Sequence, residues 1–168
     1  MQLDTQRPSY LGAIPPGAPG TRATLRLMSA LVQRYKRTPR MRDAAIDLIR
    51  ELPPKDWSAE VRALFEFVRD RVRYTRDIRG VETVQTPDVT LDLEAGDCDD
   101  MSTLLATLLE VIGHPTRFVA VGYTTPGDFQ HVYVETRVGP KWIALDPTMQ
   151  VPAGWAPRAP VSRMVVNN

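Results

Sequence analysis

The sequence has few of the side chains that build disulfides and metal sites. Its 168 residues include one cysteine, Cys98, and two histidines, His114 and His131. A single cysteine cannot form an intrachain disulfide, so nothing in the fold requires an oxidising compartment. One cysteine and two distant histidines do not make the ligand set of a zinc site. The aspartates beside Cys98 lack the glycine and the closing glutamate of a calcium-binding loop. The sequence therefore predicts no metal ion and no other cofactor.

Long apolar runs and targeting signals are also missing. No stretch approaches the roughly 18 apolar residues of a membrane span, and the N-terminus lacks the basic-then-apolar pattern of a secretory signal. Synthesis in the cytoplasm and no membrane span are therefore expected. The formal net charge is +1, with basic residues concentrated in the first half of the chain and acidic residues in the second. The basic residues are dispersed along predicted helices without a recognisable reading motif, so nucleic-acid binding is not expected.

Proline and glycine divide the chain into a central domain and two ends. The length suits one domain with a sizeable core. Residues 7–20 carry proline and glycine too densely for a helix or a central strand, so residues 1–20 are expected to form an extended arm. Residues 151–168, with three prolines around Trp155, are expected to form a Pro-rich tail. The domain then covers residues 21–150. Either end could bind a partner, although Trp155 is expected to pack back on its own domain.

Two periodicities follow one another along the central region. Apolar residues at helical spacing predict helices at residues 21–36, 40–52 and 58–72 and from Cys98 onward. Alternation with a period of two predicts strands at residues 116–123, 130–138 and 141–145. The connection at residues 76–97 shows no strong period, and long connections of this kind often have a functional role.

Cys98 lies at the start of a regular helix. Apolar residues from Met101 to Ile112 follow the stripe of a helix with one buried face, and Gly113 ends it. Cys98 is on the same stripe, in the first turn, where backbone N–H groups lack internal partners and the helix dipole is positive. That position favours a thiolate, which is the reactive form of cysteine. The alternative is that Cys98 is a small core residue.

A predicted hairpin brings a histidine and an aspartate to neighbouring strands. His131 begins one strand, and Asp146 directly follows the next. If the loop covers residues 137–140, Thr136 pairs with Lys141 and His131 falls opposite Asp146, with Cβ atoms about 5 Å apart. An imidazole N–H could then reach the carboxylate. With the single cysteine, these residues would supply the nucleophile, the base and the orienting group of a catalytic triad.

Each of these residues also has a purely structural interpretation. A histidine in a strand is more often structural than catalytic, and Asp146 before Pro147 is a common start of a turn. The aspartates next to Cys98 could be first-turn helix charges, and they oppose a thiolate electrostatically. His114 cannot replace His131, because it lies at the far end of the helix, roughly 24 Å from Cys98.

Three motifs, in this order, resemble those of the transglutaminase-like superfamily. Gly96-Asp97-Cys98-Asp99-Asp100 resembles its cysteine motif, residues 131–135 its histidine motif and residues 142–148 its aspartate motif. The resemblance covers about residues 58–150, and the most similar members are small bacterial and tailed-bacteriophage proteins. It implies a papain-like α+β core, with N-terminal helices and the cysteine helix packed on an antiparallel sheet.

The resemblance implies a catalytic triad of Cys98, His131 and Asp146. The motifs supply no certain side chain for stabilising an oxyanion, so the backbone N–H of Cys98 is the expected donor. Gln85, in the connection before the cysteine helix, and Trp142 are the further candidates for oxyanion stabilisation or substrate binding. The alternative, which is the more common case, is that Gln85 is a plain loop residue.

Two functions follow from the resemblance. The first is a cysteine hydrolase that cleaves peptide or isopeptide amides through a thioester, with acyl transfer to an amine as a variant. The chain is far smaller than animal transglutaminases and shows no calcium-binding domains, which favours hydrolysis over cross-linking. The second is a structural component of a phage tail or neck, in which the terminal arms bind other virion proteins. The expected partner is a protein or peptide substrate in the first case and the virion in the second.

Overall fold

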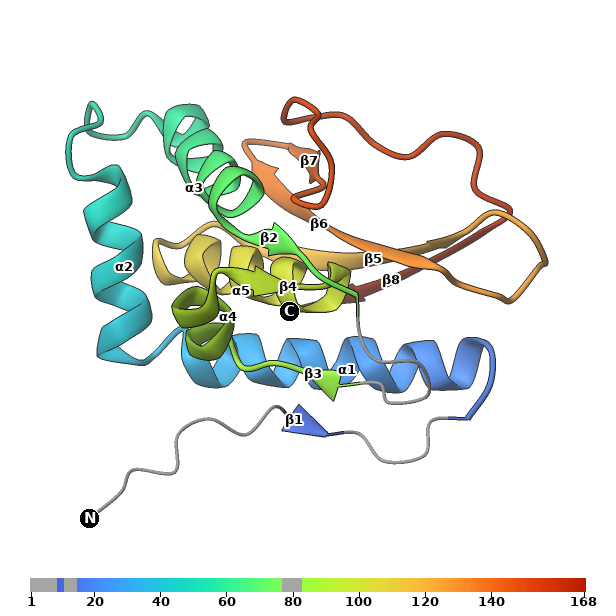
Figure 1. Cartoon of the computed structure of the whole chain (residues 1–168). Coiled ribbons are helices and arrows are strands. Elements are labelled where there is room, and N and C mark those ends of the chain that lie inside the picture. The colour runs from blue at the N-terminus through green and yellow to red at the C-terminus, as the bar shows by residue number, and fades with distance from the viewer. Residues whose placement is uncertain (1–8, 11–14, 77–82) are drawn as a thin grey trace, which may run out of the picture.

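The computed structural model describes residues 9–10, 15–76 and 83–168 (Figure 1). Within these ranges, five helices pack together and, through α1 and α5, against one face of a four-stranded antiparallel sheet. The helices are α1 (Ala18–Tyr35), α2 (Pro39–Ile49), α3 (Trp57–Arg71), α4 (Pro87–Leu93) and α5 (Cys98–Val111). The sheet has the order β7-β6-β5-β8, from β5 (Thr116–Gly122), β6 (His131–Val138), β7 (Lys141–Leu145) and β8 (Ser162–Asn167). The predicted α+β fold, with the cysteine helix packed on an antiparallel sheet, is confirmed.

Two short strand pairs flank the start of α5. β1 (Ser9–Tyr10) pairs antiparallel with β3 (Thr83–Val84), and β2 (Arg73–Tyr74) pairs parallel with β4 (Ala95–Gly96). The Thr75 N–H extends the second pair by donating to the carbonyl of the last residue of β4 at 2.8 Å. Because one residue separates β4 from α5, this pair fixes the position at which the helix begins.

Helix α5 is the centre of the core and is buried nearly all round. It contacts the other four helices and the strands β5 and β6. The four leucines between residues 104 and 109 have no exposed surface, and burying one leucine fully contributes about 1.5–3 kcal/mol. Polar residues of the helix are buried as well; the Thr107 hydroxyl donates to the Thr103 carbonyl at 2.7 Å. The single buried stripe expected from the sequence is therefore too narrow a description of this helix.

Three helices begin earlier than the sequence suggested. α2 begins at Pro39 rather than Arg40, with Thr38 as its N-cap. α3 begins at Trp57 rather than Ser58, because Asp56 is the N-cap and accepts a hydrogen bond from the Ala59 N–H at 3.0 Å. α1 begins at Ala18 rather than Thr21. The two prolines and the glycine directly before it had led us to expect an extended arm there. Of the arm predicted over residues 1–20, residues 1–8 and 11–14 lie outside the described residues.

The connection predicted at residues 76–97 contains a helix that was not expected. α4 spans seven residues, which is too short for a helical period to be seen in the sequence. Pro87 stands in its first turn, where a missing N–H has no cost. Glu94 ends it with φ of +46°, in the left-handed region. Residues 77–82 of the connection lie outside the described residues.

The hairpin between β6 and β7 has a shorter loop than expected. Val138 pairs with Lys141, so Gly139 and Pro140 form a two-residue loop in place of the four residues 137–140. Gly139 has φ of +59°, a conformation that glycine adopts without steric cost. The pairing is therefore shifted by two residues from the predicted one. A shift of two keeps every side chain on its expected face of the sheet.

Part of the expected C-terminal tail belongs to the sheet. β8 pairs antiparallel with β5 along six residues. Between β7 and β8, the Gly154 N–H donates to the Ala144 carbonyl and the Val161 N–H to the Gly122 carbonyl, both at 2.8 Å. In Figure 1 this connecting segment runs above the sheet, whereas α1 lies below it. The tail predicted at residues 151–168 is therefore a strand over residues 162–167.

The central place of α5 gives a testable expectation for stability. We expect Leu108→Ala to lower the free energy of unfolding by about 2–5 kcal/mol, because it leaves a cavity against several elements. Leu93→Ala is the matched control, since the same change falls on a side chain of α4 that is 59% exposed; we expect less than about 0.5 kcal/mol. Urea unfolding followed by circular dichroism measures both. Similar losses in the two variants would contradict this description of the core.

Candidate active site

Cys98 is the first residue of α5 and is held there by a capping box. The Asp97 carboxylate accepts hydrogen bonds from the N–H groups of Asp99, at 2.9 Å, and Asp100, at 3.2 Å. In return, the Asp100 carboxylate accepts the Asp97 N–H at 3.1 Å. Acidic residues are favoured at this end because the helix dipole is positive there. The Cys98 N–H takes no part in the box, and the helix itself offers it no acceptor.

Asp100 also fastens the preceding connection to the start of α5. Its side chain is buried, and its second oxygen accepts the Gln85 N–H at 2.7 Å. Gly96 lies against the same carboxylate, because a Cβ at residue 96 would stand 2.6 Å from the Cβ of Asp100. The backbone that carries Cys98 is thus fixed from two sides.

His131 and Asp146 form a hydrogen bond at one end of the β6–β7 hairpin. The Asp146 Oδ2 atom lies 2.7 Å from His131 Nε2. Asp146 has no exposed surface, and its Oδ1 atom accepts hydrogen bonds from the Thr148 N–H at 3.1 Å and the Thr148 hydroxyl at 2.7 Å. With the register shifted by two, the carboxylate reaches the ring diagonally rather than from the directly opposite position.

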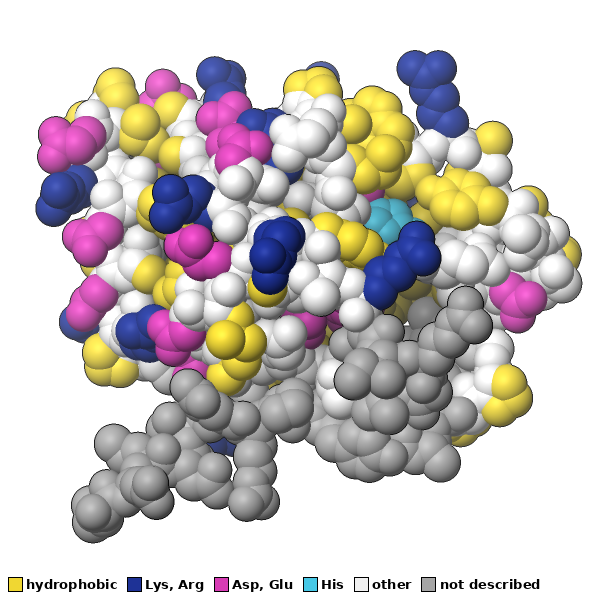
Figure 2. Space-filling view, in the orientation of Figure 1, with side chains coloured by type: hydrophobic (Ala, Val, Ile, Leu, Met, Phe, Trp, Pro, Cys, Tyr) yellow, Lys and Arg dark blue, Asp and Glu magenta, His cyan; other side chains and the backbone are white. Residues whose placement is uncertain are grey.

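A pocket of about 530 Å³ contains both Cys98 and His131. Its walls come from four parts of the fold: residues 97–99 at the start of α5, residues 128–132 at the start of β6, Ala120 of β5, and residues 15–17 with the first turns of α1. Figure 2 shows a histidine at the surface with hydrophobic side chains and a basic side chain around it. The predicted nucleophile and the predicted base therefore share one cavity.

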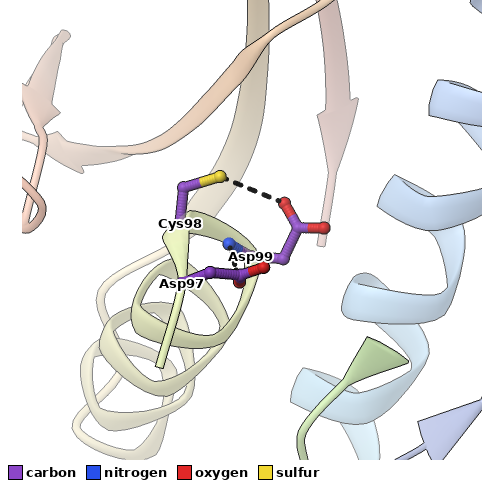
Figure 3. Close-up of side chains that lie close together, drawn as sticks. All are labelled: Asp97, Cys98 and Asp99. Carbon is purple, nitrogen blue, oxygen red and sulfur yellow. Dashed lines mark hydrogen bonds between the residues drawn. The ribbon is translucent and has the colours of Figure 1, made fainter. Parts of the chain in front are cut away.

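Asp99 accepts the hydrogen bond that the Cys98 thiol donates. Sγ donates to Asp99 Oδ1 at 3.6 Å, and both side chains point to the same side of the first turn (Figure 3). In the part of the chain that the structure describes, no hydrogen bond joins Sγ to the His131 ring. The thiol and the imidazole thus face one pocket without being bonded to each other.

The surroundings of Cys98 favour the neutral thiol, in contrast to the thiolate expected from the sequence. Burial raises the pKa of the thiol well above its usual value, and the negative charges of Asp99 and Asp97 raise it further. A hydrogen bond from the Val132 backbone lowers this pKa, but it does not offset the other effects. The helix dipole is a modest effect, whereas loss of hydration and two nearby carboxylates act strongly against a second negative charge.

The two other candidates from the sequence are not in the pocket. The Gln85 side-chain oxygen lies 3.5 Å from the Thr90 hydroxyl, which donates to it. Trp142, on β7, is 36% exposed, and the guanidinium of Arg117 lies 4.2 Å from the centre of its ring. Neither residue is among those that line the pocket.

Two tyrosines near the site were missed by the sequence analysis. Tyr74 pairs with Gly96 in the β2–β4 ladder and is 46% exposed; burial raises its pKa, and the charge of Asp97, with that of Cys98 when the thiol is ionised, adds to the rise. Tyr123 follows β5 and is 43% exposed; burial and the charge of Asp146 raise its pKa. No periodic pattern marks single aromatic residues in a two-residue strand or just after a strand, so the sequence held no signal for them.

Asp97, Cys98 and Asp99 offer three potential donor atoms within 4.8 Å of one another. The set joins two carboxylates to a thiol. Calcium and magnesium prefer ligand sets made of oxygen alone, and a structural zinc site needs a fourth ligand. We therefore assign no metal ligand among these residues.

None of the described helices combines the length and the apolar character needed to cross a membrane.

Comparison with known proteins agrees with the fold. The model of the transglutaminase-like superfamily matches residues 46–147. The fold is similar to a candidate protease from Parabacteroides distasonis, with a TM-score of 0.61, 17% identity, and coverage of 91% of this chain and 30% of that one. It is also similar to a candidate cysteine protease from Cytophaga hutchinsonii, with a TM-score of 0.57, 19% identity, and coverage of 84% and 51%.

A third similar structure is LapG of Legionella pneumophila, with a TM-score of 0.51, 19% identity, and coverage of 76% of this chain and 75% of that one. The chain thus spans about a third of the Parabacteroides protein, about half of the Cytophaga protein and about three quarters of LapG. No match to the sequence of a curated protein is found. Since the family model matches well over half of its residues, the chain belongs to the transglutaminase-like superfamily.

Proposed function

We propose that the chain is a cysteine hydrolase that cleaves peptide or isopeptide amides, with Cys98 as nucleophile, His131 as base and Asp146 as the group that orients the base. The observation that carries this proposal is the 2.7 Å hydrogen bond from His131 to buried Asp146, in a histidine that lines the same pocket as Cys98. The similarity of the fold to candidate proteases supports the same reaction class.

The first half of the reaction forms a thioester. Asp146 holds the proton on Nε2 of His131, which leaves Nδ1 as the acceptor for the thiol proton. Once Sγ has turned toward the ring, Nδ1 takes its proton, and the thiolate attacks the carbonyl carbon of the substrate amide. The carbonyl oxygen becomes negative, and the Cys98 N–H at the start of α5 is the donor that stabilises it. His131 then gives its proton to the amide nitrogen, the C–N bond breaks, and the amine leaves.

The second half releases the acyl group. His131 takes a proton from water, and the hydroxide attacks the thioester carbon. As the C–S bond breaks, His131 returns the proton to the departing sulfur, which gives a carboxylic acid and the free thiol. An amine in place of water gives a new amide by the same steps, so acyl transfer needs no further residue. The exposed faces of Tyr74 and Tyr123, near Cys98 and Asp146 respectively, suit contacts with a peptide substrate.

The alternative of a phage structural protein rested on extended ends of the chain. The C-terminal end now has a structural role within the chain, because residues 162–167 complete the sheet. The described residues offer no observation that favours assembly into a virion over hydrolysis.

An acylation experiment tests the proposal without a known substrate. We expect p-nitrophenyl acetate to acetylate Cys98, and His131→Ala to slow the release of nitrophenolate by about 100-fold or more, because the base is lost. His114→Gln is the matched control: this second histidine bonds to Glu60, 2.9 Å away, and does not line the pocket. Mass spectrometry locates the acetyl group. Equal acylation rates in His131→Ala and the parent protein would contradict the role of His131.

The role of Asp146 can be tested separately. Asp146→Asn keeps the size of the side chain but removes the charge that fixes the tautomer of His131, so we expect acylation to slow by about 10²- to 10⁴-fold. Stopped-flow measurement of the acylation burst gives the rate, and a thermal melt shows whether the variant is folded. A folded Asp146→Asn protein that acylates at the parent rate would remove Asp146 from the mechanism.

A further inference from the structure

The thiol of Cys98 has two neighbours with opposite chemical effects. On its own helix, the Asp99 carboxylate accepts the hydrogen bond from Sγ at 3.6 Å (Figure 3). Across the pocket is the imidazole of His131, which can accept the same proton. A carboxylate beside the sulfur stabilises the proton on it, because a thiolate would bring two negative charges together. The imidazole has the reverse effect, because it becomes positive when it takes the proton.

We propose that Asp99 holds Cys98 as a neutral thiol in the free protein, so that the nucleophile forms only when Sγ turns from Asp99 to His131. This rests on the proposed function, in which Cys98 is the attacking group. Asp99 thus touches the reacting atom and controls when its proton is released. The movement required is small, since rotation about the Cα–Cβ bond of Cys98 redirects the sulfur between staggered positions.

The groups that face the thiol make Asp99 the residue to test. The charged and titratable side chains around it come from four parts of the fold: Asp97 and Asp99 on α5, Tyr74 on β2, His131 on β6 and Asp128 in the loop before β6. Among the carboxylates, Asp99 bonds the sulfur directly, and its charge is the largest electrostatic cause of the raised thiol pKa, after burial. Asp97 also opposes a thiolate, but it caps the helix and cannot be changed without cost to α5.

The consequence is a nucleophile protected at rest. Electrophiles and oxidants attack thiolates, so a thiol kept neutral reacts slowly with both. A substrate that fills the pocket can change the balance by displacing the Asp99 carboxylate from the sulfur. The thiol would then react only slowly with small electrophiles, while a substrate that fills the pocket could still be attacked.

Alkylation of the full chain by iodoacetamide, followed across pH 6–10 by mass spectrometry, tests this inference. We expect Asp99→Asn to move the midpoint of the alkylation profile down by about one pH unit or more, which raises the thiolate fraction at neutral pH about tenfold. The rate there should rise about three- to fourfold, because a thiolate of lower pKa is also a weaker nucleophile.

Three comparisons keep the test decisive. Asp128→Asn removes a carboxylate from the same pocket without touching the sulfur and should change the rate less than about twofold, since an exposed charge is screened. Asp99→Glu retains the charge and should leave the profile closer to that of the parent protein than Asp99→Asn does. Thermal melts show which variants are folded, and Asp99→Ser replaces Asp99→Asn if the latter is not.

The outcome is separate from that of the acylation test. An unchanged midpoint in folded Asp99→Asn, or an equal shift in Asp128→Asn, would overturn the role of Asp99 while leaving the triad untouched. Conversely, alkylation involves no leaving amine and no acyl-enzyme. The alkylation midpoint could shift in Asp99→Asn while the acylation rate stays the same in His131→Ala. That result would support the influence of Asp99 on the thiol and reject the proposed function.

Discussion

The first turn of α5 is the constraint on which the rest of the structure depends. Its backbone N–H groups need acceptors, and the carboxylates of Asp97 and Asp100 supply them. Asp100 then serves twice, because its other oxygen binds the N–H of Gln85 and so joins the preceding connection to the helix. The helix behind this turn is enclosed by four other helices and by the sheet, so the turn cannot shift without disturbing the core. Cys98 is the residue that this arrangement presents to the pocket.

The second fixed point is the end of the β6–β7 hairpin. A two-residue loop sets the register, and the register decides that Asp146 reaches His131 diagonally. Thr148 compensates for that geometry by binding the other oxygen of Asp146 with both its N–H and its hydroxyl. The carboxylate is thereby held in one orientation although it lies beyond the last paired residue of the strand. The role proposed for His131 needs this kind of support, since a base must present one ring nitrogen to the nucleophile in one tautomer.

The sequence was sufficient for the elements with enough residues to show a period. The four longer helices and the three strands before residue 146 follow from apolar spacing, and Gly113 ends α5 where expected. α4 was not predicted because its seven residues make less than two helical turns, too few to show a period. β8 was not predicted because three prolines precede it. The residues of its partner β5 with which it pairs are forty to fifty positions away in the sequence, beyond the range of a local pattern. The hairpin register was off by two, since alternation fixes the face of a strand but not its exact partner.

For the site, residue identity was easier to predict than protonation state. Cys98 and His131 do line one cavity and His131 does bond to Asp146, whereas Gln85 and Trp142 lie elsewhere. The prediction of a thiolate considered only the helix dipole, which can be inferred from a predicted helix start. Burial depends on what packs against the residue and becomes visible only in three dimensions, and it has the larger effect on the Cys98 pKa. The same acidic residues that stabilise the helix start also oppose a negative sulfur. The aspartates at this helix start therefore stabilise the fold and disfavour a Cys98 thiolate at once. In the proposed reaction, a partner for the proton, rather than the helix itself, generates the thiolate.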